Sequence, residues 1–167
     1  MAVLPVRTFP DPLLKKPSRP VEHITPSIEH LIRDLVDTMR HHPRCVGLAA
    51  PQLGGNLQLA VVDVTGHPKA KHTTGLVVLI NPKLLHREES TVQREGCLSI
   101  PDLTANVQRA VRVQVTALDE TGRSWTRWFE GFEAIAMQHE IDHLDGTLFL
   151  DRVVNIKTDV FRRKSYG

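Results

Sequence analysis

Residues 138–144 carry the pattern H-E-x-x-H within a stretch that favours a helix. His139 and His143 are four positions apart, so on a helix their imidazoles lie on one face, one turn apart. Both can therefore bind one metal ion, and Glu140 leaves the helix at the edge of that face, where it can take a proton from water that the metal activates. The pattern predicts a hydrolytic metal site and leaves the third protein ligand open.

A catalytic site of this kind has three protein ligands and one open coordination position. The third His of a metzincin is replaced here by Phe149, and no Glu follows Glu140 to act as a ligand of the thermolysin type. Cys97, within the sequence E-G-C-L-S, can supply a thiolate, but a cysteine in this setting is also typical of a buried small apolar residue. Asp151 and Asp159 are the alternatives, and either would indicate a small metallopeptidase.

A third cluster, residues 46–52, is small and apolar and ends in the amide of Gln52. Such a tight segment can lay a backbone edge beside an extended ligand. The Gln52 amide can donate to a developing oxyanion. The same residues are equally typical of a plain connection between a helix and a strand, with Gln52 in solvent.

The spacing of apolar residues predicts two long helices that position these groups. The first begins after Thr25 and ends before Pro43, and its apolar stripe predicts packing on a sheet without a chemical role. A short turn is expected from Asp11-Pro12 through Leu14. The second helix spans about residues 131–144, with one face formed by Phe132, Ile135, Ala136, His139 and His143. Asp142, near the opposite edge of that face, can orient a ligand or pair with an arginine.

Strands are predicted for residues 57–64, 76–80, 112–118 and 124–130, with a turn at 119–122 and a solvated polar loop at 66–75. The gaps between successive strands are too short for helical crossovers, which favours antiparallel pairing. The order of helix, strands and a late helix predicts an α+β fold.

Composition indicates an ordinary globular protein. The 167 residues suit one domain, residues 1–167, with 41% hydrophobic and 24% charged residues. A net charge of +2 is too small to indicate a direct nucleic-acid site by itself. No apolar run is long enough to span a membrane, and we expect no secretory signal. Two cysteines are too few for a disulfide scaffold, so a reducing compartment is expected.

The three segments together resemble the motifs of the peptide deformylase family, G-x-G-L-A-A-x-Q, E-G-C-x-S and Q-H-E-x-D-H. They match in the same order, and the resemblance covers nearly the whole chain, with the motifs at residues 45–52, 95–99 and 138–143 and further matches at 80–82 and 146–149. One departure is Cys45, which replaces the glycine at the start of the first motif. This change is expected to alter the local turn or the wall of the substrate pocket.

The resemblance implies mostly antiparallel sheets packed around a central C-terminal helix that carries H-E-x-x-H. It implies a metal-dependent hydrolase that removes the formyl group from the N-terminal formyl-methionine of newly synthesised polypeptides and releases formate. The implied metal is Fe(II), with Zn, Ni or Co as substitutes, bound by Cys97, His139 and His143.

The resemblance also implies the roles of the surrounding residues. Glu140 is expected to transfer the proton, and Gln52 and the backbone N–H of Leu98 are expected to hold the oxyanion. The residues expected to bind substrate or brace its site are Val46, Gly47, Glu95, Phe132, Ile135 and Ala136. Glu95 is further expected to pair with Arg109 and so brace the loop of Cys97.

The expected partners are formylated nascent peptides, in a bacterial-type cytoplasm or, after removal of a transit peptide, in an organelle. A transient ribosome contact is left open, because the chain stops soon after Arg152 and we expect no long C-terminal helix like that of some bacterial relatives. Two further alternatives are a divergent family member acting on another acylated amine and a non-catalytic metal- or peptide-binding module. The presence of Gln52 and Glu140 argues against the latter.

Overall fold

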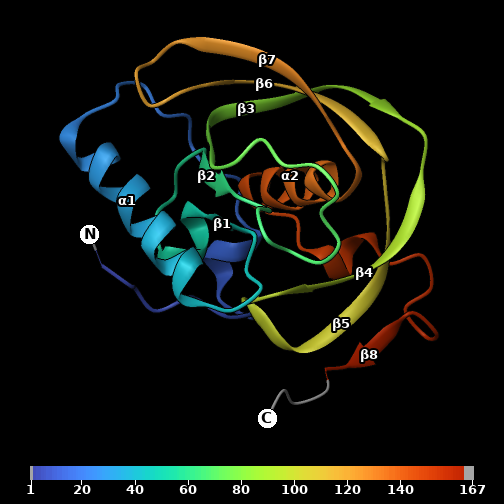
Figure 1. The fold of residues 1–167 in the computed structure, drawn as a ribbon. Coiled ribbons are helices and arrows are strands. Elements are labelled where there is room, and N and C mark those ends of the chain that lie inside the picture. Colours follow the sequence, from blue (N-terminus) through green and yellow to red (C-terminus); the bar gives the residue numbers. More distant parts are fainter. Residues whose placement is uncertain (1, 164–167) are drawn as a thin grey trace.

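The computed structural model describes residues 2–163, which form an α+β fold with two antiparallel sheets (Figure 1). The helices are α1 (Pro26–His41) and α2 (Gly131–Leu144), with short 3-10 helices at Pro12–Lys15, Ala50–Leu53 and Phe149–Arg152. The strands are β1 (Gly47–Ala49), β2 (Leu59–Val62), β3 (Val77–Glu88), β4 (Thr91–Cys97), β5 (Ile100–Arg109), β6 (Arg112–Leu118), β7 (Ser124–Glu130) and β8 (Val160–Arg162). One sheet has the order β1-β2-β3-β6-β7, and the other has the order β4-β5-β8.

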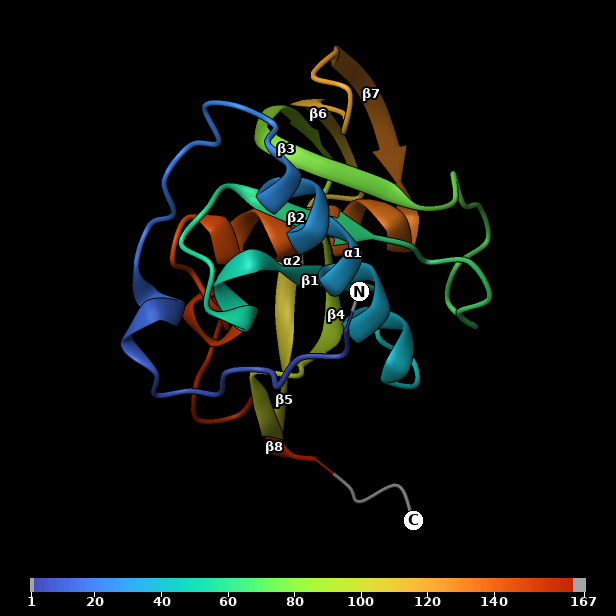
Figure 2. The ribbon, with the colours of Figure 1, turned by 90° about the vertical axis from the view of Figure 1, so that its left-hand side faces the viewer.

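Helix α2 lies at the centre of the molecule, as the resemblance implied. Figures 1 and 2 show β3, β6 and β7 on one side of it and β4 and β5 on the other. Almost every residue of α2 is buried, including Met137 and Ile141, which pack against Val113, Val115 and Phe129 of the larger sheet. A helix that is buried on all sides holds its side chains in fixed positions, which suits a helix that carries a metal site.

Helix α1 covers the opposite face of the larger sheet and confirms the predicted amphipathic helix. It begins where the Thr25 hydroxyl accepts a hydrogen bond from the backbone N–H of Ile28 at 3.3 Å. Its apolar stripe packs on alternate residues of β2, Leu59 and Val61, while Ala60 and Val62 face the core around α2. Strand β2 is therefore continuously apolar because both of its faces are covered.

The predicted strands are partly confirmed. The ranges 112–118 and 124–130 agree with β6 and β7, and the paired strands are antiparallel. The range 57–64 is too long, and 76–80 is too short, because β3 continues through a half-exposed polar segment with irregular register against β6. Strands β1, β4, β5 and β8 were not predicted. They are short, polar or begin beside a proline, and they are defined by their partners across the sheet.

The end of α2 brings an early segment of the chain against the later part of the fold. Gly146 has a φ of 75°, and a Cβ there would lie 2.7 Å from the carbonyl carbon of Lys15. This close approach lets the 3-10 turn at Pro12–Lys15, predicted from Asp11-Pro12, insert Leu14 into the small core that also contains Cys97 and Phe149.

Candidate metal centre

Strand β4 and helix α2 bring Cys97, His139 and His143 together. One potential ligand atom from each of the three residues lies within 4.8 Å of the others. The Cys97 Sγ is 3.3 Å from His143 Nε2. A thiolate and two imidazoles at this spacing fit a first-row transition metal, and three protein ligands leave a coordination position for a reactant. The side chains present therefore fit a metal cofactor.

The alternative third ligands lie elsewhere. Asp151 forms an ion pair with Lys15 and accepts a hydrogen bond from the backbone N–H of Leu148. Asp159 accepts from the Asn106 amide at 3.2 Å. Neither carboxylate belongs to the ligand group within the described residues, so the metallopeptidase arrangement built on either of them is wrong.

Burial and the two imidazoles act in opposite directions on Cys97. Burial by itself would raise the pKa of the Cys97 thiol, but the charge of His143 and hydrogen bonds with both histidines lower it well below its ordinary value. The thiolate in turn raises the pKa of His139, against the effect of burial. The site thus favours the deprotonated sulfur that a metal requires.

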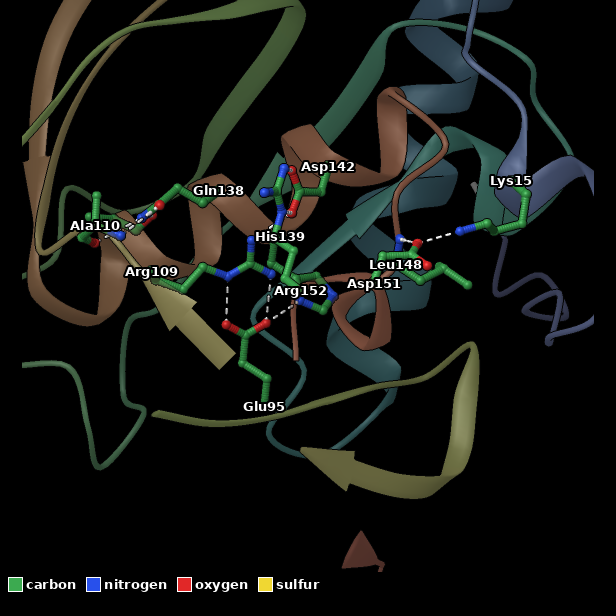
Figure 3. A network of polar contacts seen from close by, with 11 residues as sticks. Lys15, Glu95, Arg109, Ala110, Gln138, His139, Asp142, Leu148, Asp151 and Arg152 are labelled. Atoms are coloured by element: carbon green, nitrogen blue, oxygen red, sulfur yellow. Dashed lines mark hydrogen bonds and ion pairs between the residues drawn. The ribbon is translucent and has the colours of Figure 1, made fainter. Parts of the chain in front are cut away.

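Glu95 orients His139 through a contact with the ring nitrogen Nδ1 (Figure 3). The Arg109 guanidinium donates to both Glu95 carboxylate oxygens, at 2.7 and 2.9 Å, which confirms the predicted pair. Although burial opposes it, these bonds and that to His139 lower the pKa of Glu95 to about 2. Because Glu95 is ionised, His139 Nδ1, 2.9 Å away, must donate to it, which leaves Nε2 as the free ring nitrogen for the ligand group.

Asp142 extends this buried network on the other side of Arg109. It accepts from Arg109 Nη1 at 2.5 Å and from Arg152 Nε and Nη2 at 2.6 and 2.8 Å. Of the two roles considered for Asp142, the ion pair with arginine is the one that the structure contains. Gln138 fixes the preceding turn of α2 by exchanging two 2.9 Å hydrogen bonds with the backbone of Ala110.

Arg109→Gln should lower the free energy of unfolding by about 3–5 kcal/mol, because it leaves the buried carboxylates of Glu95 and Asp142 without their shared cation. Urea denaturation of the two proteins measures the difference. The matched control is Arg112→Gln, which breaks an exposed pair with Glu88 and should cost less than about 1 kcal/mol. Equal losses in the two variants would contradict the importance of the buried network.

Glu140 lies beside the ligand group on the same cavity wall. Its side chain is buried, and its Oε1 has no hydrogen-bond partner among the described residues. Burial raises the pKa of this carboxyl, with the neighbouring histidines opposing the shift. Strand β1 passes so close that a Cβ on Gly47 would lie 2.6 Å from Glu140 Oε2. Gly47 therefore makes room for Glu140.

Gln52 is buried, so the interpretation that placed it in solvent is wrong. Its Oε1 accepts from the backbone N–H of Ala49 at 3.0 Å. Its Nε2 donates to the Ser99 hydroxyl at 3.0 Å and lies 3.5 Å from Cys97 Sγ. The amide is thus held with its donor end toward the ligand group, beside Leu98 in the same cavity wall.

A cavity of about 700 Å3 opens onto the ligand group. All the residues expected at the substrate site line it: Val46, Gly47, Glu95, Phe132, Ile135 and Ala136. The polar loop at 66–75 is mostly exposed, as predicted, but His67 and Lys69 also line the cavity. His67 stacks on Phe132 with 4.4 Å between ring centroids, and Thr74 donates two hydrogen bonds to Glu133. No spacing pattern marks this loop, because its position depends on contacts with α2.

Cys45, the departure from the first motif, is a neutral thiol in the cavity wall. Burial and the nearby charge of Glu140 raise its pKa to about 12. Its Sγ donates to the carbonyl oxygen of Gly47 at 3.3 Å. The substitution therefore adds a side chain at the entrance to β1 without adding a charge.

The comparisons with known proteins agree with this geometry. A family model described as polypeptide deformylase matches residues 3–159. A peptide deformylase of Alkalilimnicola ehrlichii is 41% identical over 98% of this chain and 89% of its own length. The crystal structure of peptide deformylase from Thermotoga maritima matches with a TM-score of 0.85 and 35% identity over 93% of this chain and all of that one. A Met-Ala-Ser-bound peptide deformylase from Acinetobacter baumannii matches with a TM-score of 0.84 and 34% identity over 91% of this chain and 99% of its own.

Proposed function

This chain belongs to the polypeptide deformylase family, and from that membership we propose how its own residues carry out the reaction. The protein is a metal-dependent hydrolase that removes the formyl group from the N-terminus of newly synthesised polypeptides. The observation that carries the assignment of roles is the group formed by Cys97, His139 and His143 at the cavity, with Glu140 beside it.

We assign the metal to Cys97, His139 and His143, and we propose Fe(II), with Zn, Ni or Co as substitutes. When bound, the metal supplies Lewis-acid chemistry: it polarises the formyl carbonyl and makes water acidic enough to react near neutral pH. The donor set is compatible with each of these ions, and the choice of iron rests on the resemblance to the family.

Glu140 is the proposed general base and acid. Its unpartnered Oε1 takes a proton from water while the water oxygen forms a bond to the formyl carbon. The same carboxyl then gives that proton to the peptide nitrogen as the carbon–nitrogen bond breaks. Formate and a free amino terminus are the products, and Glu140 is again ionised.

Gln52 and Leu98 are proposed to hold the oxyanion that develops on the formyl oxygen. Support for Gln52 comes from its burial and from the fixed direction of its Nε2, set by the Oε1 contact to Ala49. Leu98 follows Cys97 directly and would contribute its backbone N–H. Each such donor typically contributes about 3–4 kcal/mol to transition-state stabilisation.

The peptide is proposed to lie along β1, which is an edge strand of the larger sheet. Val46 and Gly47 would contact its backbone, and Phe132, Ile135 and Ala136 would surround the methionine side chain. Glu95 also lines the cavity, but its oxygens already accept from Arg109 and His139, so we assign it to positioning His139.

Gly47→Ala should lower turnover about 100-fold while the metal content stays unchanged, because the added methyl group displaces Glu140 by a fraction of an ångström or more. Steady-state kinetics and elemental analysis of the same sample measure the two quantities. Gly55→Ala is the control, since its Cβ would meet Leu31, 3.3 Å away, and should leave turnover within a few-fold of wild type. Undiminished turnover in Gly47→Ala would show that Glu140 does not need its observed position.

A formate-release assay on protein purified without oxygen tests the function and the metal together. We expect formate from formyl-Met-Ala-Ser, no cleavage of unblocked Met-Ala-Ser, and iron at one equivalent by elemental analysis. Peptide-bond cleavage without formate would instead indicate a peptidase. Zinc in place of iron in the protein as purified without oxygen would contradict the assignment of iron as the native metal.

The proposed substrates are formylated nascent peptides. We propose that the protein acts in the cytoplasm and contacts the ribosome transiently, because such chains emerge there. The low cysteine count, Cys45 and Cys97, is too small for a disulfide scaffold and so supports a reducing compartment. Over residues 2–163, neither long helix has the length and apolar character needed to cross a membrane.

A further inference from the structure

The mouth of the cavity is positively charged. Among residues 2–163, two carboxylates line the cavity; Glu95 is paired with Arg109, and Glu140 is buried near the ligand group. Four side chains in the lining carry a positive charge at neutral pH: Arg44, Lys69, Arg94 and Arg163. A cleft lined by one sign of charge attracts ligands of the opposite sign.

Two of these arginines lie on one face of the smaller sheet. Arg94 and Gly96 are two residues apart on β4, so they face the same way. A Cβ on Gly96 would collide with Nη2 of Arg163, which places that guanidinium directly against Gly96. Strand β8 thus carries an arginine from the far end of the chain to the residue before Cys97.

Contacts within the sheet hold this pair in place. The Arg94 guanidinium carbon lies 3.7 Å from the ring centroid of Phe161, and its Nε is 3.3 Å from Asn106 Oδ1. The backbone N–H of Arg163 donates to the Asp102 carbonyl at 2.8 Å. Neither guanidinium has an ion pair with a carboxylate in residues 2–163.

We propose that Arg94 and Arg163 form a subsite for a side-chain carboxylate of the substrate, and that this enzyme prefers formylated peptides with an acidic residue soon after the formyl-methionine. The inference rests on the proposed function: the formyl group must reach Cys97 and Glu140, so the following residues pass the mouth. A guanidinium fork matches the geometry of a carboxylate and is more pre-organised than a lysine.

Peptides that differ in one charge test the subsite. Three pairs of formyl-Met tetrapeptides carry Glu or Gln at position two, three or four, and C-terminal amides remove the terminal carboxylate as a second source of charge. At one position we expect kcat/KM to be about fivefold higher for Glu than for Gln at low salt, mainly through a lower KM. The ratio should fall toward one at about 0.5 M salt.

Variants then assign the preference to particular side chains. Arg163→Gln and Arg94→Gln should each bring the Glu/Gln ratio close to one, and Arg163→Lys should restore part of it. Arg162→Gln is the matched control, because it removes the same charge from the adjacent residue, the exposed last residue of β8, which lies outside the cavity lining, and it should keep the full ratio. Thermal melting checks that each variant is folded.

A ratio of one at every position in the wild-type protein would overturn the subsite, and so would a preference that survives both Arg94→Gln and Arg163→Gln. Equal formate release from all six peptides leaves the deformylase activity intact and refutes only the carboxylate preference. Absence of formate from every peptide with metal-loaded protein would refute the proposed function itself.

Discussion

Glu140→Gln is expected to bind the metal normally and to lose turnover by a factor of about 100 to 10,000. Glutamine has nearly the same shape as glutamate, so it keeps the packing against Gly47, where a Cβ would already lie 2.6 Å from Oε2. An amide cannot accept a proton from water at neutral pH or return it to the leaving nitrogen. The variant therefore removes the proton transfer without removing the ligands.

The measurement is kcat for formate release, with the metal content determined in the same sample. Glu130→Gln provides the control, because Glu130 precedes α2, is exposed and has no role in the cavity. It should retain wild-type turnover. If metal-loaded Glu140→Gln also kept near-normal turnover, another group would have to move the proton, and the role assigned to Glu140 would be wrong.

The helical half of the site could be predicted from the sequence because its geometry is local. Once residues 131–144 form a helix, the spacing of His139, Glu140 and His143 alone fixes their shared face. The same local reasoning gave α1, with Thr25 at its start. The central, buried position of α2 was expected only from the resemblance to the family.

The other half of the site depends on contacts between distant segments. Strand β4 has three consecutive polar residues followed by Gly96 and Cys97, and its register against β5 shifts at these last two, so no regular alternation marks the strand. The position of Cys97 could be assigned to the site only by elimination and by resemblance to a family. Arg163 was missed entirely, because only the pairing of β8 with β5 brings it to Gly96.

Buried ion pairs connect the α2 half of the site to the β4 half. Sequence spacing does not identify which charged residues pair with one another. Arg109 on β5 reaches Glu95 on the neighbouring strand and Asp142 on α2, so one cation connects both halves of the ligand group. Glu95 in turn fixes the ring of His139. The expected pair of Glu95 and Arg109 was therefore correct, but its connection to α2 emerged only from the fold.

Cys97→Ser tests whether the β4 half of the site supplies a metal ligand. This variant should lose the metal. A serine hydroxyl is close to cysteine in shape but is neither a thiolate at neutral pH nor a soft ligand. Metal affinity should fall by more than about 100-fold, since changing even the outer partners of metal ligands costs 10- to 100-fold. Formate release should fall with the metal content.

Elemental analysis after dialysis and thermal melting with and without a chelator measure this loss. Because a metal that binds only the folded state raises the melting temperature, a chelator should lower it for the wild-type protein and leave that of Cys97→Ser unchanged. Cys45→Ser is the control: it removes the other thiol, which donates to the Gly47 carbonyl and lies outside the ligand group, and should keep one metal per chain. Full metal occupancy and an unchanged rate in Cys97→Ser would exclude Cys97 as a ligand. Two histidines on α2 would then need another third partner, although within residues 2–163 the fold brings no other His, Cys, Asp or Glu into their ligand group.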